Sequence, residues 1–345
     1  MINQSQLDRK FMLEALHLAR QAWGQTSPNP MVGAVVVKDG MIVGRGYHHK
    51  AGTPHAEVHA LNDAGALAKD ATIYVTLEPC STYGRTPPCT EAIKAAGIKR
   101  VVAACEDFNA KHAGNGFAIL REAGIEVKVG VCEKAAIELN KAFFSYITRK
   151  RPYVLLKMAM TLDGKIATAS GDSKWITGAA ARSRVQELRR WCDCIMVGGE
   201  TLRLDRPGLE VREPANWQQQ PLKIIYTTMP QAEVAGYFPD DSSVMTATAS
   251  TAGEWQELLL ELGKRDITAL LLEGGGNLAA AALKAGIVDE VEFHIAPKIL
   301  TGRNSRSVVS GSDPLKLAEA LNLDKLTVKR AGADLLISGK IKYEE

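Results

Sequence analysis

The chain has 345 residues, 46% of them hydrophobic and 23% charged, with a formal net charge of +3. This length favours two domains, each long enough to bury its own core. The interleaved acidic and basic residues include no concentrated basic stripe, which argues against a nucleic-acid-binding protein. There is no secretory signal pattern, no apolar run of the ~18 residues that a membrane span needs, and too few cysteines for a disulfide framework. We therefore expect a protein of the reducing cytoplasm without membrane or nucleic-acid partners.

The first part of the chain predicts alternating helices and strands. An amphipathic helix is expected over 5–23 with Ser5 as its N-cap, and Asp39-Gly40 indicates a hairpin turn between strands. The further helices are predicted over 55–68, 89–97, 116–124 and 133–147, and the strands over 32–37, 41–47, 71–77, 99–105 and 125–131. This alternation predicts an α/β fold with a largely parallel sheet.

A polar, basic segment that ends in proline, 148–152, is the predicted linker between a first domain of 1–147 and a second of 153–345. The second domain repeats the alternation. Strands are predicted over 153–160, 194–198, 222–227, 267–272, 289–296, 325–329 and 334–341, and helices over 179–191, 252–263 and 277–285. The stretch 203–221 is rich in Arg, Pro and Gln and is expected to form a loop.

The strongest functional motif is His55-Ala-Glu57, followed by Glu78-Pro79-Cys80 and then Cys89. One imidazole and two thiolates form a ligand set for catalytic zinc, which keeps its fourth position for water and lowers the pKa of that water to roughly 7. Glu57 lies near the start of the same predicted helix as His55 and would move protons. The H-x-E and P-C pattern is typical of zinc deaminases, although here eight residues separate the two cysteines.

Two other interpretations stay open. His59 lies one helical turn after His55 and could complete a structural site with four protein ligands, or Cys80 and Cys89 could be unrelated buried thiols. The remaining cysteines lack partners at useful spacing, so we expect free buried thiols at Cys105, Cys132, Cys192 and Cys194.

Further segments resemble one family over nearly the whole chain. Similarity to the deaminase half of the bifunctional RibD family of riboflavin biosynthesis lies in 28–33, 44–48, 54–60, 75–81 and 84–89. Similarity to the reductase half of that family lies in 157–165, 173–177, 273–275 and 295–298. The two halves follow each other in the expected order.

The resemblance implies a cytidine-deaminase-like α/β/α domain followed by a dihydrofolate-reductase-like α/β domain. The first would use Zn²⁺ to hydrolyse the 2-amino group of 2,5-diamino-6-(5-phosphoribosylamino)pyrimidin-4-one, which yields 5-amino-6-(5-phosphoribosylamino)uracil. The second would reduce the ribosyl side chain to ribityl with NADPH. The expected partner is this small phosphoribosyl-pyrimidine, and the expected assembly is a homo-oligomer, either dimer or tetramer.

The resemblance also implies site residues. In the deaminase half, Glu57 would be catalytic, His55, Cys80 and Cys89 would bind the metal, and the substrate contacts would be Asn29, His48 and Arg85, with Asp107 and Asn109 as further candidates. In the reductase half, the substrate contacts would be Ser173, Arg189, Leu209, Arg212 and Glu273. The cofactor contacts would be Ala159, Trp175, Thr201, Asp205, Thr228, Gly275, Gly276, Asn277, Leu278, Ala279, Ala280 and Ala281.

The local chemistry of the reductase half is compatible with these roles. Glycines before a predicted helix let the backbone approach a phosphate, although a simple strand-to-helix turn has the same pattern. Arg189 and Arg212 suit phosphate clamps, because a guanidinium matches phosphate geometry. Lys157 on the first strand could polarise or protonate the reacting sugar, or could form an ion pair at a strand end.

The chain departs from the usual family pattern at Ser27, Thr82, Phe108, Asn115, Glu210 and Thr227. None of these positions is a metal ligand or Glu57, so they bear on substrate and cofactor contacts. Two other functions remain alternatives: a deaminase of another nucleobase with a non-catalytic C-terminal binding domain, and a zinc-stabilised scaffold without activity.

Overall fold

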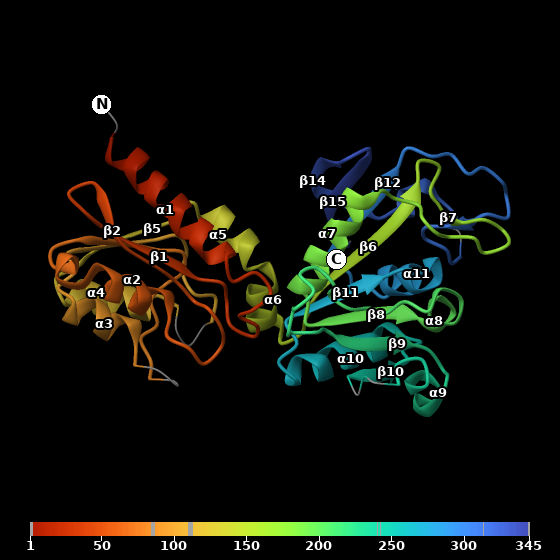
Figure 1. Cartoon of the computed structure of the whole chain (residues 1–345), viewed down its shortest axis with the longest axis horizontal. Coiled ribbons are helices and arrows are strands. Elements are labelled where there is room, and N and C mark those ends of the chain that lie inside the picture. Colours follow the sequence, from red (N-terminus) through yellow and green to blue (C-terminus); the bar gives the residue numbers. More distant parts are fainter. Residues whose placement is uncertain are drawn as a thin grey trace. The chain divides into compact units, whose positions relative to one another are not determined.

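The computed structural model describes residues 3–83, 87–109, 113–239, 241, 243–312 and 314–343. The chain forms two compact units, Met1–Lys150 and Arg151–Glu345 (Figure 1). In each unit, helices pack around a central sheet, so the predicted α/β class is confirmed. No helix within the described residues is long and apolar enough to cross a membrane.

The first unit contains a five-stranded sheet with the order β2-β1-β3-β4-β5. Its elements are α1 Gln4–Arg20, β1 Gly33–Lys38, β2 Met41–Tyr47, α2 Ala56–Ala64, the 3₁₀ helix η1 Gly65–Ala68, β3 Thr72–Val75, α3 Cys89–Ala95, β4 Arg100–Ala103, α4 Asn115–Glu122, β5 Glu126–Val129, α5 Glu133–Leu139 and α6 Lys141–Arg149. Strands β3, β4 and β5 are parallel, and the hairpin β1–β2 pairs antiparallel with β3.

Three glycines let helices lie directly on the hairpin. A Cβ at Gly33 would come within 2.0 Å of the Ala15 carbonyl oxygen of α1. On the opposite face, a Cβ at Gly44 or Gly46 would meet α2 backbone oxygens at 2.2 Å and 2.4 Å. Only glycine permits such close approach, so these positions set the height of α2 above the sheet. Because α2 begins beside the predicted metal ligand His55, they also position the site.

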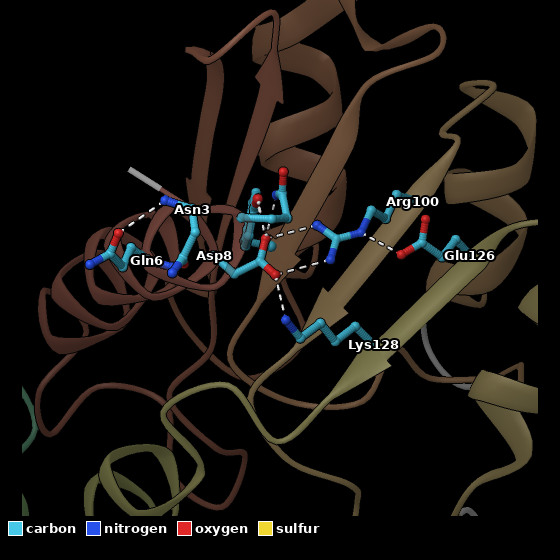
Figure 2. Close-up of polar contacts among 8 residues, drawn as sticks. Asn3, Gln6, Asp8, Arg100, Glu126 and Lys128 are labelled. Carbon is cyan, nitrogen blue, oxygen red and sulfur yellow. Dashed lines mark hydrogen bonds and ion pairs between the residues drawn. The ribbon is translucent and has the colours of Figure 1, made fainter. Parts of the chain in front are cut away.

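A buried carboxylate ties α1 to the parallel strands (Figure 2). Asp8 is fully buried and accepts hydrogen bonds from Arg100 at 2.8 Å and 3.0 Å, from Lys128 at 2.8 Å and from the Tyr74 hydroxyl at 2.9 Å. Burial alone opposes ionisation, but the bonds from Arg100 and Lys128 outweigh it and hold the pKa of Asp8 below its usual range. Asp8 therefore connects α1 with β3, β4 and β5.

The second unit contains an eight-stranded sheet with the order β10-β9-β8-β11-β6-β12-β15-β14, and β13 pairs separately with β7. Its elements are β6 Tyr153–Thr161, β7 Lys165–Ala167, α7 Ala179–Trp191, β8 Cys194–Gly198, α8 Gly199–Asp205, β9 Leu222–Tyr226, α9 Gln231–Ala235, β10 Val244–Ala247, α10 Ala252–Lys264, β11 Ala269–Glu273, α11 Gly276–Lys284, β12 Glu290–Ala296, β13 Arg306–Ser307, the 3₁₀ helix η2 Leu317–Glu319, β14 Asn322–Ala331 and β15 Asp334–Lys342. The six strands from β10 to β12 in this order are parallel, β15 pairs antiparallel with β12, and β14 pairs antiparallel with β15. The central strands β8 and β11 are buried almost throughout, as is typical of parallel sheets covered on both faces.

Every long element predicted from the sequence is present, but details differ. The predicted single helix over 133–147 is divided into α5 and α6 at Asn140, whose side chain exchanges hydrogen bonds with the Met31 backbone at 2.8 Å and 2.9 Å. The N-cap of α1 is Asn3, not Ser5, and Asn3 and Gln6 form a capping box (Figure 2). Helix α6 continues to Arg149, so the predicted linker 148–152 begins inside a helix.

Candidate active sites

The three predicted metal ligands lie together in the first unit. The ligand atoms of His55, Cys80 and Cys89 all lie within 4.8 Å of one another. His55 Nδ1 is 3.1 Å from Cys89 Sγ and 3.5 Å from Cys80 Sγ, and the Cys89 backbone N–H donates to Cys80 Sγ at 3.3 Å. One imidazole and two sulfurs at these separations fit a zinc ion with one position left for water.

Local structure explains why these residues converge. His55 is the N-cap of α2 and Cys89 is the first residue of α3, whereas Cys80 follows β3 in an extended segment. The hydrogen bond from the Cys89 side chain lowers the pKa of the Cys80 thiol, and the proximity of Cys80 in turn raises the pKa of Cys89. The lowered pKa favours a thiolate at Cys80, which is the form that binds zinc.

Glu57 lies in the first turn of α2 and is only 3% exposed. Burial, together with the nearby negative charge of Cys80, raises the pKa of this carboxyl group. A carboxyl group with a raised pKa holds its proton more readily and can accept and return one, as an acid/base residue must. The sequence predicts that Glu57 lies beside the metal ligands. Glu57 lies in the first turn of α2, directly after its N-cap His55.

His59 does not join the metal ligands. Among the described residues, the cluster suited to a metal contains only His55, Cys80 and Cys89. The His59 ring instead stacks on His49 with 4.5 Å between ring centroids. The alternative of a structural site completed by His59 is therefore not supported by the geometry.

Two of the predicted substrate contacts in this unit lie side by side. Asn29 Nδ2 is 3.1 Å from His48 Nε2, and His48 Nδ1 is 3.2 Å from the Pro54 carbonyl oxygen. The His48 ring packs edge-on to His55 with 5.4 Å between centroids, and His48 is only 3% exposed. From its position in the sequence alone, His48 resembled a surface loop residue. The third predicted contact, Arg85, lies outside the described residues.

Glu78, which belongs to the Glu78-Pro79-Cys80 motif but has no role assigned from the sequence, holds the loop that follows β4. Its carboxylate accepts backbone hydrogen bonds from Asp107 at 3.1 Å, Gly114 at 3.0 Å and Gly116 at 2.9 Å. A Cβ at Gly116 would lie 2.2 Å from the Pro79 carbonyl oxygen. Glu78 thus fixes the segment on either side of the predicted contacts Asp107 and Asn109. The motif places Glu78 two residues before Cys80, but the motif alone does not show that Glu78 binds this loop.

The second unit contains a cavity of about 860 Å³. All of the predicted substrate contacts line it: Lys157, Ser173, Arg189, Leu209, Arg212 and Glu273. The predicted cofactor contacts that line it are Ala159, Trp175, Thr201, Asp205, Gly275, Gly276, Asn277 and Leu278. The predicted cofactor contacts outside its lining are Thr228, Ala279, Ala280 and Ala281. Sequence reasoning missed the lining residues Tyr226 and Arg306, which lie in no recognised motif.

At the floor of this cavity, Arg189 of α7 binds Glu273 at the end of β11. The guanidinium donates to both carboxylate oxygens, at 2.8 Å and 2.9 Å, and to the Glu210 carbonyl oxygen at 3.1 Å. Burial would raise the pKa of Glu273, but the charge of Arg189 outweighs it and lowers that pKa. This bidentate pair keeps both side chains charged in a buried place.

Lys157 lies between two carboxylates in the sheet register. It pairs with Glu273 of β11 on one side and with Glu292 of β12 on the other, so the three side chains share a face. Within the described part of the chain, however, Lys157 forms no hydrogen bond or ion pair of its own. The ammonium group therefore remains available to a ligand in the cavity that Lys157 lines.

The turn from β11 to α11 brings backbone to the cavity wall. Gly274 and Gly275 have φ of 69° and 80°, which only glycine adopts without strain. A Cβ at Gly276 would lie 2.5 Å from the Ser307 carbonyl oxygen. These glycines open the N-terminus of α11 toward the cavity, where its backbone N–H groups favour an anion. Nearby, Ser173 donates to Asp205 at 3.0 Å and thereby joins two predicted contact segments.

Two residues of the second unit that depart from the usual family pattern, Glu210 and Thr227, contact neighbouring side chains or backbone. The Glu210 carboxylate lies 3.4 Å from the buried Lys223 Nζ, which also binds Asp241. The Thr227 hydroxyl accepts a hydrogen bond from the Met229 backbone N–H at 3.1 Å. A Cβ at Gly199 would lie only 2.5 Å from this hydroxyl. Glu210 and Thr227 thus support the strands beside the cavity. In the first unit, Phe108 packs on Phe144 with 4.2 Å between ring centroids.

Comparison with known proteins covers both units. Residues 5–105 match the family model of the cytidine and deoxycytidylate deaminase zinc-binding region, and residues 152–337 match that of the RibD C-terminal domain. The riboflavin biosynthesis protein RibD of Aquifex aeolicus is 44% identical and that of Escherichia coli 39%, each alignment covering 96% of this chain and 98% of the relative.

Solved structures agree with these matches over the full length. Acinetobacter baumannii RibD has a TM-score of 0.89 at 38% identity and covers 99% of this chain and 100% of its own. The diaminohydroxyphosphoribosylaminopyrimidine deaminase/5-amino-6-(5-phosphoribosylamino)uracil reductase of Thermotoga maritima has a TM-score of 0.88 at 34% identity, with the same coverage. The expected fold class, a deaminase-like unit followed by a reductase-like unit, is confirmed. The chain therefore belongs to the RibD family of bifunctional riboflavin biosynthesis enzymes, which combine a deaminase and a reductase.

Proposed function

We propose that residues 1–147 hydrolyse the 2-amino group of 2,5-diamino-6-(5-phosphoribosylamino)pyrimidin-4-one at a zinc site formed by His55, Cys80 and Cys89. The observation that carries this proposal is the convergence of these three ligand atoms within 4.8 Å. Zinc, when bound, supplies a water molecule of lowered pKa that can attack at neutral pH. His59 packs elsewhere, so the donor set fits a catalytic ion better than a structural one.

Glu57 is the proposed acid/base residue of this reaction. Hydrolysis replaces the amino group by a carbonyl oxygen, so protons must move from water to the ring nitrogen and to the departing ammonia. A buried carboxyl with a raised pKa can accept the first proton and return it. Asn29 and His48 would bind the pyrimidine beside the metal, and the mutual hydrogen bond that orients them supports this role. Arg85 is a further proposed substrate contact.

We infer that residues 153–345 reduce the ribosyl side chain of the deaminated product with NADPH, which supplies the hydride when bound. The 860 Å³ cavity is large enough for a cofactor and a sugar. The glycines before α11 and the neighbouring contacts Ala159, Trp175, Thr201, Asp205, Asn277 and Leu278 would hold the cofactor. Thr228, Ala279, Ala280 and Ala281 are further proposed cofactor contacts, although they do not line the cavity.

In the proposed reduction, Lys157 donates a proton to the ring oxygen of the ribose as that ring opens at C1′. Its uncommitted ammonium group and its position in the cavity lining support this role. Because Arg189 already donates three hydrogen bonds, we assign it to orient Glu273. The exposed side chain of Arg212 is then the better phosphate clamp. Ser173 and Leu209 would complete the substrate side.

The assembly and location belong to the same proposal. Strand β14 at the sheet edge exposes Leu323, Leu326 and Val328 by 39%, 58% and 58%, and an exposed apolar edge of this kind favours association of copies. We therefore propose a homo-oligomer, either dimer or tetramer, which light scattering would measure. The free thiols of both units suit a reducing cytoplasm.

One experiment tests both activities. The diaminopyrimidine substrate, zinc and NADPH are supplied together, and ammonia release is followed with the loss of NADPH absorbance. We expect one NADPH oxidised for each ammonia released. Ammonia release without NADPH oxidation would indicate a deaminase with a non-catalytic C-terminal unit, and the absence of both would indicate a scaffold.

A further inference from the structure

We propose that Glu292 is a positioning residue for the reduction, whose fixed negative charge keeps the neighbouring Lys157 ammonium charged and directed at the cavity. This inference rests on the proposed role of Lys157. Glu292 belongs to β12 and lies next to Lys157 of β6 in register, with about 4.8 Å between neighbouring strands. None of the motifs used above includes Glu292.

Glu292 is held rigidly by groups other than Lys157. Arg184 of α7 donates to its two oxygens at 3.1 Å and 3.0 Å, and His294 Nε2 lies 2.9 Å from Oε1. Glu292 is only 4% exposed, so these bonds are sheltered from water. A carboxylate saturated in this way exerts its charge on Lys157 without forming the direct ion pair that would draw the ammonium away from the substrate.

Glu292 and Glu273 are equivalent neighbours of Lys157. Each carboxylate pairs with Lys157 in register, one from each side, and each is bound in bidentate fashion by an arginine of α7. The charged or titratable groups around Lys157 are Glu273 of β11, Arg184 and Arg189 of α7, and Glu292 and His294 of β12. His294 is fully buried, and this burial lowers its pKa.

The charges explain why both carboxylates are needed. Burial lowers the pKa of Lys157, Arg189 lowers it further, and Glu273 and Glu292 oppose both effects. If Glu292 were absent, Arg184 would remain uncompensated and would also favour loss of the Lys157 proton. An uncharged lysine could not protonate the ring oxygen of the ribose. As the pH rises, the rate of reduction would therefore begin to fall at a lower pH than in the unaltered protein.

The test is the pH profile of single-turnover reduction, measured with saturating NADPH in the full-length protein. In Glu292→Gln, we expect the alkaline limb of the rate to move down by about 1 pH unit, the lower end of the range for loss of an opposite charge, because Glu292 forms no direct ion pair with Lys157. Glu292→Asp keeps the negative charge, so the alkaline limb of its profile should lie close to that of the unaltered protein. Glu187→Gln is the matched control, because Glu187 binds the same Arg184 at 2.9 Å on the exposed side, and its profile should match that of the unaltered protein.

Arg184→Gln provides a test with the opposite sign. Glu292 would then be free to bind Lys157 directly, so the alkaline limb should move up while the maximal rate falls. If Glu292→Gln binds NADPH normally and keeps the original alkaline limb, the proposal is wrong. If Glu292→Gln does not fold, the pH profile of Arg184→Gln becomes the test. An alkaline limb that is unchanged or lowered in Arg184→Gln would overturn the proposal.

A separate variant distinguishes this inference from the function on which it rests. Lys157→Met should abolish reduction and leave ammonia release intact. Reduction that survives in Lys157→Met would refute the proton-donating role of Lys157 itself. Loss of reduction in Lys157→Met, combined with an unshifted Glu292→Gln profile, would refute only the role of Glu292.

Discussion

Replacing Asp8 by asparagine removes the charge at the centre of the buried network of the first unit while keeping its shape. The carboxylate is fully buried and receives two hydrogen bonds from Arg100 and one each from Lys128, Tyr74 and Gln4. Removing one partner of a buried ion pair typically costs about 3–5 kcal/mol. Because the Lys128 side chain is 39% exposed and can be solvated, we expect a loss near the lower end, about 3 kcal/mol.

Calorimetry of the full chain is the appropriate assay. For a domain of this size, a loss of about 3 kcal/mol corresponds to a fall of about 6–12 °C in the melting temperature of the deaminase unit. Glu126→Gln is the control, since Glu126 binds the same Arg100 at 2.7 Å but is 66% exposed, and exposed pairs contribute about 0–1 kcal/mol. Equal melting shifts for the two variants, or no shift for Asp8→Asn, would refute the assignment of stability to this carboxylate.

The effect should also depend on pH with a definite sign. The pKa of Asp8 is lower in the folded than in the unfolded chain, so its stabilisation is present above about pH 4 and is lost as the pH falls toward the folded-state pKa. The stability difference between the unaltered chain and Asp8→Asn should therefore be constant from pH 8 to about pH 5. Below about pH 4 it should shrink.

Three further predictions concern the two sites. Chelation of zinc should abolish ammonia release but not reduction. In the chelated protein, the lowered pKa of Cys80 should make this thiol react with an alkylating agent at a lower pH than an ordinary cysteine does; alkylation that rises only above about pH 8 would contradict this. Gly276→Ala places a Cβ 2.5 Å from the Ser307 carbonyl oxygen. Overpacking of about 1–3 kcal/mol at this turn should weaken NADPH binding by about 5- to 150-fold in a titration. An unchanged Kd would show that the turn is not part of the cofactor site. Arg189→Gln leaves Glu273 buried without its partner, so reduction should be lost and the reductase unit destabilised by about 3–5 kcal/mol in denaturant titrations, whereas normal reduction would exclude a role for this pair.

Much of the deaminase site is encoded locally and could be predicted. His55 and Glu57 are two residues apart at a helix start, Cys80 lies in the segment after β3, and Cys89 begins α3, so the short-range pattern was sufficient to group them. His48 was harder, because its burial depends on the Pro54 carbonyl and on Asn29, which lies on another segment. The exclusion of His59 also required the structure, since stacking on His49 decides where its ring points.

The reductase site depends on strand order, which the sequence did not reveal. Glu292 lies beside Lys157 only because β12 pairs with β6, although the two residues are far apart in the chain. The break between α5 and α6 has the same origin, because the Asn140 side chain binds the distant Met31 backbone. Short elements such as β7, α8, α9, β10 and β13 contain too few residues to show a periodicity.

The most direct test of the central claim is single-turnover deamination by Glu57→Gln, with zinc content measured on the same sample. We predict that zinc remains bound, that ammonia release falls by about 10²–10⁴-fold because proton transfer is lost, and that reduction of the separately supplied deaminated substrate is unchanged. Ammonia release near the original rate with zinc retained would contradict the assignment of Glu57 and the proposed chemistry of this site.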